Sequence, residues 1–550
     1  MEIVMFFRKK KSGQYEYLQI VEGYRDGDKV RQRVVLTLGT AEEWINGGKL
    51  DSLLASGARL SEKMAVITEH QAGNSKPVAG TRIGPDLVFG RLWRELKIDE
   101  ILRTCAEERH VQFDLERAVY HTVMHRLFES GSGRASLVWD DDFLLPGTDG
   151  LKLQHFYRAM GFLGRPLDDQ TGAVKFAPRC VKDAVEEKIF AARRDLFSNL
   201  SMVFFDTTSI YFEGEGGESL GEYGYSKDHR PDRRQMVLGA VLDGSGIPLG
   251  CEMWPGNTTD VATIKEVVKR FQNGFGIREV CIVADRGMIS QDMLDFLESE
   301  ECSFSYILGV RLRRVKEVSG EVLARAGRYH EIEPANPRRE PLKIKEVKHN
   351  GRRYVICLND AQARKDAHDR EVIVAALRDK LKAGDKSLVG NTGYRKYLKS
   401  SGKKHFEIDE DKLRAEARFD GKWVLTSNTA LGADDLALQY KQLWMVENTF
   451  RTMKSGLDTR PIFHRLDRTI RGHVFCSFLA ILLRRELERR LTAKGFDFEW
   501  NDILHDLAAL EEVTAEVSGK RVIFRSELRG CAGKVFQAAG VAVPPTVRFA

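Results

Sequence analysis

Alternation of apolar and polar residues predicts β-strands at the start of the chain. The segments EYLQIVEGY and VRQRVVLTLG alternate in this way and are rich in β-branched and aromatic residues. They are separated by RDGDK, whose Asp-Gly pair is typical of a tight hairpin turn. From about residue 85 to 195 the apolar positions instead follow a helical period, as in LERAVYHTVMHRLFES. We therefore expect a β-hairpin and a helical region, with a polar linker near residues 70–82 between them.

The pattern changes near residue 201 to buried strands and helices in alternation. SMVFFDTTSIYF is an almost continuous apolar run, and two further strands within residues 236–254 flank a DGSG turn. TIKEVVKRFQNGFG and SQDMLDFLESE have helical periodicity, the second with Ser290 as a plausible N-cap. REVCIVADRGMIS and SFSYILGVRL predict two more strands. Strands that alternate with helices favour an α/β core with a mixed sheet.

Residues 311–425 predict a strand-rich module inserted into this core. LKIKEVK and RRYVICLND flank the turn HNG, and ARFDGKWVLTSN is a second hairpin-like segment with Asp-Gly at its turn. REVIVAALRDKLK predicts a helix between them. After the module, residues 434–456 and 467–493 predict two strong helices, and residues 496–550 a small mixed tail.

Composition indicates a folded protein and says little about its partners. Hydrophobic residues make up 42% and charged residues 30%, and the net charge of +6 is small for 550 residues. The basic residues are nevertheless concentrated in three stretches, 227–235, 310–316 and 451–471. The apolar run VFCSFLAILL is too short to span a membrane, and the eight cysteines show no CxxC pair. We expect reduced thiols, a cytoplasmic protein and no membrane partner.

Two predicted strands end in an aspartate, Asp206 in VFFDTTS and Asp285 in IVADRGM. Side chains at the ends of strands reach solvent while the backbone stays fixed, so catalytic groups are common there. A carboxylate that directly follows an apolar run is costly without a partner, and a metal ion is one such partner. The alternative is that each aspartate only caps a turn.

The helix YKQLWMVENTFRTMK supplies a third acidic residue. Tyr440, Glu447 and Lys454 are spaced by seven residues, so they lie near one stripe of the helix. Trp444 and Arg451 fall on the same broad face. Such a stripe is a poor core face and suits a polyanion. The alternative is an amphipathic surface helix with a Glu447–Arg451 pair.

These segments together resemble bacterial insertion-sequence transposases of the DDE type, in the group with a strand-rich insertion before the final glutamate. The motif of that group, Tyr-x2-Arg-x3-Glu-x6-Lys, stands here as Tyr440, Leu443, Glu447 and Lys454. FFDTTSIYFE and VADRGM are similar to its two aspartate boxes, and GYSKDHRPDRRQ, WPGNTTD and IRGHVFCSFLAILL to further elements. The boxes occur in order, separated by 285 − 206 = 79 and 447 − 285 = 162 residues.

One position departs from the family pattern. Leu443 stands where the family has an arginine that is expected to touch backbone phosphate at the end of the element. That single contact is therefore in doubt. Arg451, one helical turn after Glu447, is the candidate substitute.

The resemblance implies an α/β protein whose ribonuclease-H-like catalytic core is interrupted by a β-rich insertion, with a β-hairpin N-terminus and a helical N-terminal region. It divides the chain into six parts. These are a β-rich segment (1–70), a helical region for binding the DNA end (83–195), the first part of the core (196–310), the insertion (311–425), the second part of the core (426–495) and a C-terminal tail (496–550).

The resemblance also implies a chemistry, in which Asp206, Asp285 and Glu447 converge as catalytic residues and metal ligands. Carboxylates gathered in one cleft repel one another unless cations bind, and hard oxygen ligands select Mg²⁺ or Mn²⁺. Two ions per site can activate a water or a DNA 3′-hydroxyl and stabilise the leaving oxygen at phosphorus. The expected activity is cutting at the terminal inverted repeats of the chain's own insertion sequence and joining of the ends to target DNA.

The expected partners are double-stranded DNA, as inverted repeats and target, and further copies of the chain in a homodimer or larger synaptic complex on the bacterial nucleoid. The candidate DNA-binding residues lie on the predicted helix and in the basic loop after the first strand. They are Tyr440, Trp444, Arg451, Lys454, Lys227, His229, Arg230, Arg233 and Arg234.

Two other functions stay open from the residues. A catalytically inactive regulator descended from a transposase would bind the element's ends and release no 3′-hydroxyl. A metal-dependent phosphohydrolase of small substrates would not need the basic stretches, and its activity would depend little on salt, whereas DNA binding weakens steeply as salt rises.

Overall fold

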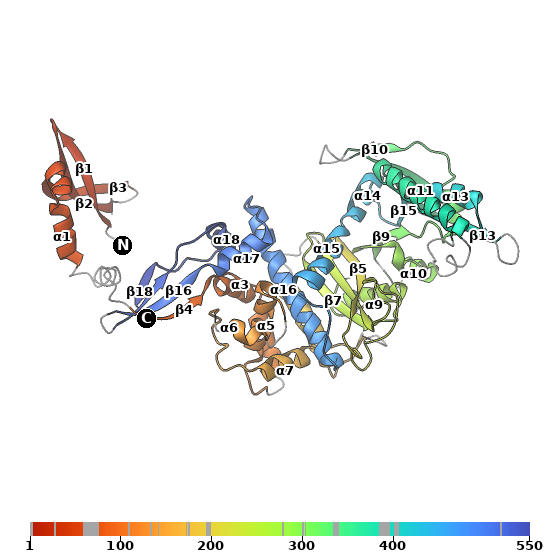
Figure 1. Ribbon diagram of the computed structural model, residues 1–550, viewed down its shortest axis with the longest axis horizontal. Coiled ribbons are helices and arrows are strands. Elements are labelled where there is room, and N and C mark those ends of the chain that lie inside the picture. Colours follow the sequence, from red (N-terminus) through yellow and green to blue (C-terminus); the bar gives the residue numbers. More distant parts are fainter. Residues whose placement is uncertain are drawn as a thin grey trace. The chain divides into compact units, whose positions relative to one another are not determined.

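The computed structural model forms two compact units, which are described separately below (Figure 1). One unit contains residues 1–85, 142–144 and 498–550, and the other residues 86–141 and 145–497. The residues whose structure is described are 4–26, 29–58, 76–107, 111–131, 135–140, 142–171, 173, 177–193, 200–277, 280–299, 302, 304–333, 340–383, 396–400, 406–517 and 520–549.

The first unit begins with a three-stranded antiparallel sheet of β1 (Val4–Ser12), β2 (Tyr15–Asp26) and β3 (Lys29–Thr40). Helix α1 (Lys49–Ala58) follows. The predicted β2–β3 hairpin is confirmed by antiparallel pairing along the two strands, although the turn residues 27–28 lie outside the described part of the chain.

The second sheet of this unit combines one strand from near residue 80 with three strands from the last 40 residues of the chain. Its order is β18 (Val547–Phe549), β17 (Lys520–Arg525), β16 (Glu511–Val517) and β4 (Lys76–Arg82). Helices α17 (Trp500–Ala508) and α18 (Ala532–Ala539) belong to the same unit. The linker predicted at 70–82 is therefore wrong for residues 76–82, because β16 supplies a backbone partner that no local pattern reveals. Residues 70–75 lie outside the described part.

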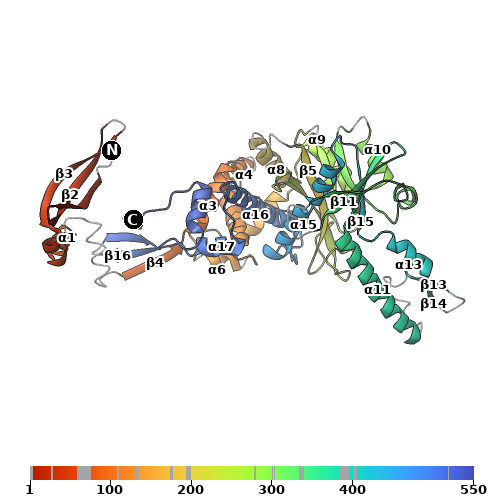
Figure 2. The same cartoon turned by 90° about the horizontal axis from the view of Figure 1, so that it is seen from above.

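The second unit opens with the predicted helical region. Its helices are α3 (Gly84–Glu95), α4 (Ile98–Glu107), α5 (Leu115–Phe128), α6 (Ala135–Asp140), α7 (Leu153–Leu163) and α8 (Val181–Ala192). The long apolar helix α16 (Asp467–Ala493), predicted at these residues, packs against α5 and α7, which are labelled in Figure 1; Figure 2 shows α16 from above. A helix from the far end of the sequence thus completes the core of this region, and its apolar run is buried among helices.

A nine-stranded mixed sheet forms the rest of this unit. Its order is β10-β11-β12-β15-β9-β8-β5-β6-β7, in which β8 runs parallel to both of its neighbours, β5 and β9, and the other neighbours pair antiparallel. The strands are β5 (Met202–Tyr211), β6 (Gln235–Asp243), β7 (Pro248–Pro255), β8 (Cys281–Ala284), β9 (Ser305–Val310), β10 (His330–Ile332), β11 (Leu342–His349), β12 (Arg352–Leu358) and β15 (Lys422–Ser427). The predicted α/β class with a mixed sheet is confirmed.

Strands from residues 311–425 extend this sheet beyond β9. The hairpin predicted around HNG is confirmed as β11 and β12, with left-handed φ of 47° and 76° at Asn350 and Gly351. Outside the sheet lie α11 (Asp360–Ala383), α13 (Glu410–Ala417) and the small pair β13 (Leu398–Ser400) and β14 (Phe406–Ile408).

The second hairpin, predicted at ARFDGKWVLTSN, is wrong. Its first half continues from α13, whose N-cap Asp409 accepts a hydrogen bond from the Lys412 N–H. Its second half is β15, whose neighbours are β12 and β9. The turn at Gly421, with φ of 63°, therefore joins a helix to a strand that pairs with distant partners.

Helices cover the two faces of the sheet around β5. On one face Val203 and Phe205 of β5 share a hydrophobic core with α9 (Asp260–Asn273) and α10 (Gln291–Leu297). The predicted N-cap Ser290 is confirmed, since its side chain accepts from the Met293 N–H. Helix α15 (Trp444–Arg451) also packs against β5 and β6. Because side chains alternate along a strand, Phe204, Asp206 and Thr208 face away from the α9–α10 core.

The long helix predicted at 434–456 is interrupted. It consists of α14 (Ala433–Lys441), α15 and a π-helical turn at Thr452–Gly456. Leu443 lies in the break before α15 and is only 8% exposed.

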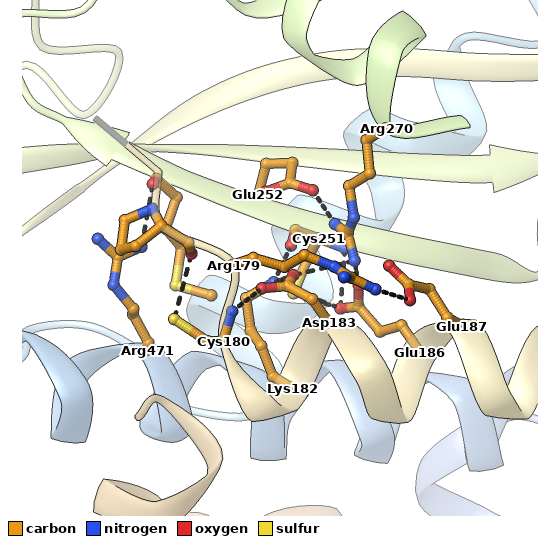
Figure 3. A network of polar contacts seen from close by, with 12 residues as sticks. Arg179, Cys180, Lys182, Asp183, Glu186, Glu187, Cys251, Glu252, Arg270 and Arg471 are labelled. Atoms are coloured by element: carbon orange, nitrogen blue, oxygen red, sulfur yellow. Dashed lines mark hydrogen bonds and ion pairs between the residues drawn. The ribbon is translucent and has the colours of Figure 1, made fainter. Parts of the chain in front are cut away.

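Buried charges fasten α8 to the strand β7 and the helix α9 (Figure 3). The Lys182 ammonium donates to Asp183 at 2.5 Å and to the Cys251 carbonyl at 2.7 Å. Arg270 of α9 lies 2.9 Å from Asp183 and also pairs with Glu186 and Glu252. Each buried charge therefore has an opposite partner, which removes much of the penalty of burial. All eight cysteines are buried and free, as predicted.

Candidate active site

Asp206 and Asp285 lie on neighbouring parallel strands. Phe205 of β5 pairs in register with Ala284 of β8, so the next residue on each chain segment is the aspartate. Asp285 directly follows β8, while Asp206 lies within β5, and both side chains are half-buried. The structure thus brings together the two aspartates that the strand pattern singled out.

Burial and like charges raise the pKa of Asp206 to about 7, and Asp285 and Asp260 are among the charges responsible. Lys227 and the Thr207 N–H, which donates to Asp206 at 2.7 Å, oppose this rise. A further cation that approaches this carboxylate would therefore stabilise its charged form.

Asp260 is a third acidic residue of the site that sequence reasoning did not identify. It is the first residue of α9 and ends the segment WPGNTTD. Its Oδ1 accepts a hydrogen bond of 2.6 Å from the Thr207 hydroxyl, and its Oδ2 lies 3.3 Å from the Lys227 ammonium. The family-like segment was the only sequence signal for it, because neither a buried strand nor a helical stripe points to this residue. We call Asp206, Asp260 and Asp285 the acid cluster.

Both ends of the predicted Tyr–Glu–Lys stripe contact this part of the sheet. The Tyr440 hydroxyl donates to Asp285 Oδ1 at 2.7 Å, and burial raises the pKa of Tyr440. Gly309 of β9 leaves the room for this hydroxyl. At the other end, the Lys454 ammonium donates to the Thr208 hydroxyl at 2.6 Å and pairs with Asp228 at 2.7 Å.

Glu447, between these two residues, is exposed, and its side chain makes no hydrogen bond or ion pair with any described residue. Within the described ranges, no three His, Cys, Asp or Glu side chains lie close enough to hold a metal ion. Trp444 is 56% exposed, so its side chain is not packed in the core. Arg451 is also exposed.

The basic loop after β5 is largely paired with acids. Arg230 contacts Asp232 at 2.9 Å, and Arg233 contacts Glu213 at 2.6 Å. Arg234 donates to the Gly221 carbonyl at 2.8 Å. His229 is exposed, with a left-handed φ of 57°. Lys227 is the member of this loop that reaches the acid cluster.

A cleft of about 880 Å³ opens beside the acid cluster. Asp260, Asp285 and Lys227 line one part of it. The other residues that line it include four arginines, Arg286, Arg311, Arg313 and Arg314. The last three come from the basic stretch 310–316, which follows β9. Carboxylates and arginines around one cleft suit a phosphate group together with cations.

Comparison with known proteins gives matches to two families. Residues 6–70 match the family described as the IS1634 family transposase, N-terminal domain, and residues 198–483 match the transposase DDE domain. No protein with a curated description matches. Among solved structures, a cryo-EM structure of a piggyBac transposase synaptic complex with hairpin DNA has 10% identity and a TM-score of 0.34. The match covers 77% of this chain and 78% of that one. None of the described helices is long and apolar enough to cross a membrane.

Proposed function

The chain belongs to the DDE transposases of bacterial insertion sequences, enzymes that cut DNA and join it to a target, and we propose which of its residues and segments perform each part of this reaction. The DDE match spans residues 198–483, more than half of the chain, and the N-terminal match belongs to an insertion-sequence transposase family. The substrates of such an enzyme are the terminal inverted repeats of its own element and the target DNA.

We propose a ribonuclease-H-like core made of β7-β6-β5-β8-β9 with α9 and α10, and of the segment 426–495. The insertion would be 311–425, although its strands continue the same sheet. The helical region 83–195 would hold the DNA end, with the β-rich segment 1–70 before it and the tail 496–550 after the core. Hydrogen bonding of β15 to β9 supports this view, because it makes the insertion an extension of the catalytic sheet.

The catalytic residues would be Asp206, Asp285 and Glu447. One observation supports this assignment most directly: Tyr440 contacts Asp285 and Lys454 contacts Thr208, and Glu447 lies between them along the chain, in the helix α15 that packs against β5. Asp206 and Thr208 point to the same face of β5, because they are two residues apart. We propose that Glu447 turns toward the face that carries Asp206, and its exposure leaves its oxygens available.

Divalent ions fit this donor set. The acid cluster offers only hard oxygen ligands, and a bound cation would offset the burial and the charges of Asp285 and Asp260 that raise the pKa of Asp206. We propose two Mg²⁺ ions per site, with Mn²⁺ as a substitute, held by Asp206, Asp285 and Glu447. Bound ions would supply Lewis-acid stabilisation of the negative charge that develops at phosphorus. Tyr440 would orient Asp285, since its hydroxyl holds one carboxylate oxygen.

DNA would lie in the arginine-lined cleft and along the exposed face of α15. Trp444 and Arg451 are exposed on either side of Glu447 and are placed to meet a sugar or a phosphate. Lys454 and Tyr440 would stay in their contacts with the sheet and shape the edge of the site. From the basic loop, the residues proposed to follow the DNA backbone are Lys227, His229, Arg230, Arg233 and Arg234.

Synapsis of two ends would require at least a homodimer acting on the bacterial nucleoid. Two copies are the minimum that can hold two identical ends in equivalent active sites.

The decisive experiment is strand cleavage of an inverted-repeat duplex with Mg²⁺. Asp206→Asn, Asp285→Asn and Glu447→Gln should each lower the cleavage rate on the order of a thousandfold or more, as loss of a catalytic group does. Asp292→Asn is the matched control, because this carboxylate is exposed on α10 and outside the cleft. Full activity of any one of the three variants would remove that residue from the site. A wild-type protein that binds the ends and releases no 3′-hydroxyl would favour the inactive regulator instead.

A further inference from the structure

Lys227 belongs to the basic loop by sequence, but its ammonium lies against the acid cluster. The Nζ atom donates to the Thr207 carbonyl at 2.8 Å and to the Thr207 hydroxyl at 2.9 Å, and lies 3.3 Å from Asp260 Oδ2. The backbone N–H of Lys227 donates to the Ser209 hydroxyl at 2.8 Å. Both the backbone and the side chain of this residue are therefore fixed to β5.

The surroundings explain why a cation lies at this point. Asp206, Asp260 and Asp285 place three carboxyl groups in one region, and repulsion among them must be offset. Among the described residues, the Lys227–Asp260 pair is the one ion pair that a member of the acid cluster makes. The nearby Lys454 ammonium is already bound to Asp228.

The hydrogen bonds of Asp260 and Thr207 show that the Lys227 ammonium is held in a defined position. Thr207 donates its hydroxyl proton to Asp260 and accepts from Lys227 at the same oxygen, so the three side chains form a closed network. The side chains of Lys227 and Asp260 are 30% and 26% exposed, so water screens the pair only in part. Both line the cleft, which gives ions access to the same space.

We propose that Lys227 is the internal counter-ion of the acid cluster, held in place by Asp260 and Thr207, and that it competes with divalent cations for this cluster before DNA binds. This inference rests on the proposed function, since it takes the acid cluster as the ion-binding site. An ammonium beside the carboxylates lowers the local negative potential, so a divalent ion gains less on binding. Asp260 is then a positioning residue, which acts through Lys227.

The test is Mn²⁺ binding to the full-length protein without DNA, measured by calorimetry and by electron paramagnetic resonance. Lys227→Met should bind Mn²⁺ about tenfold more tightly, the equivalent of removing one charge repulsion of about 1.4 kcal/mol. Lys227→Arg keeps the charge and should stay near the wild-type affinity. Arg230→Met is the matched control, because it removes one positive charge from the same loop where Arg230 is paired with Asp232. Unchanged or weaker Mn²⁺ binding by a folded Lys227→Met protein would overturn the proposal.

A second readout separates this inference from the proposed function. With EDTA present, Lys227→Met should melt several degrees below Arg230→Met, because the carboxylates lose their counter-ion, and Asp260→Asn in the Lys227→Met background should recover part of the loss. Equal melting temperatures of Lys227→Met and Arg230→Met would refute the counter-ion role whether or not ions bind. Mn²⁺ binding that Asp285→Asn leaves unchanged would instead contradict the metal site of the proposed function.

Discussion

At the scale of single residues, Asp228 fixes two cations beside the acid cluster. Its side chain is 5% exposed, and its Oδ1 lies 2.7 Å from Lys454 and 2.5 Å from Arg460. Burial lowers the pKa of Lys454, and the Asp228 carboxylate counteracts that effect and helps to keep the ammonium charged. The carboxylate thereby holds Lys454 at the distance from which it contacts Thr208.

Asp228→Asn should lower the free energy of unfolding by about 3 kcal/mol, because removing one partner of a buried pair leaves uncompensated charge. The matched control is Asp232→Asn in the same loop, which pairs with Arg230 at the surface, is 59% exposed, and should lower the free energy of unfolding far less. Urea titrations of the three proteins measure both values. Equal losses in the two variants would show that Asp228 behaves as a surface residue.

The acidic residues differ in how visible they are in the sequence. Asp206 and Asp285 follow apolar runs, and the sequence alone picked them out because a carboxylate is conspicuous at such a position. Asp260 and Asp228 stand in polar segments, where an aspartate has many ordinary reasons to occur. Only the fold shows that Thr207 and Lys454 lie next to them. The convergence of Glu447 with the aspartates remains a prediction.

At the scale of elements, the close approach of α14 to β9 depends on a residue without a side chain. A Cβ atom at Gly309 would overlap the Tyr440 hydroxyl and lie 3.0 Å from the Arg286 backbone nitrogen. Gly309→Ala should therefore displace Tyr440 from Asp285 and lower cleavage on the order of tenfold to a hundredfold, as misplacement by about 1 Å does. Gly244→Ala, in the open turn between β6 and β7, is the matched control and should keep full activity.

Tyr440→Phe tests whether a loss of activity in Gly309→Ala comes from the displaced Tyr440 hydroxyl or from a change in the sheet itself. If the hydroxyl orients Asp285, Tyr440→Phe should be impaired, and Gly309→Ala in the Tyr440→Phe background should add little further loss. A large additional loss in the double variant would place the effect of Gly309 in the sheet itself.

The packing of α5 in the helical region makes stability depend on pH. Burial lowers the pKa of His125 to about 4, with His121 and Arg126 adding to the effect. Between pH 6.5 and 4 the unfolded chain therefore binds a proton that the folded chain does not, so stability falls as pH falls through this range. His125→Gln should flatten this decline by up to about 1.4 kcal/mol per pH unit. His505→Gln, whose imidazole is 81% exposed, should leave the decline unchanged in the same denaturation series.

Most elements that are determined by residues close together in the sequence were predicted correctly. The hairpin of β11 and β12 has its Asn-Gly turn, and α16 has its long apolar face. The sequence pattern missed β4, and it placed a hairpin where α13 is followed by β15, because these strands are defined by partners far along the chain. The same limitation applies to the insertion, whose strands join the catalytic sheet through the β15–β9 pairing. Hydrogen bonding between distant strands leaves no periodic trace that distinguishes an extended sheet from a separate module.

At the scale of the whole molecule, a net charge of +6 on 550 residues says little about DNA binding, and the distribution of the charge decides it. Much of the basic loop is neutralised by its own acids, as the pairs of Arg230 and Arg233 show. By contrast, the stretch after β9 brings Arg311, Arg313 and Arg314 to the cleft beside the acid cluster. Arg311 is bound to the backbone of residues 286 and 287, and Arg313 pairs with Glu416 at 2.9 Å. Arg314 is exposed, and its guanidinium makes no hydrogen bond or ion pair with a described residue.

Arg314 should therefore contribute its full charge to a DNA phosphate in the cleft. Arg314→Ala should weaken binding of an inverted-repeat duplex several-fold and reduce the slope of log affinity against log salt by about 0.9, the value for one phosphate contact. Random-sequence duplex should lose the same factor, because a phosphate contact does not read bases. Lys316→Ala is the matched control, since this exposed lysine lies two residues further on and outside the cleft. Binding titrations at four salt concentrations measure both slopes, and equal slopes for the two variants would exclude the cleft as the path of the DNA backbone.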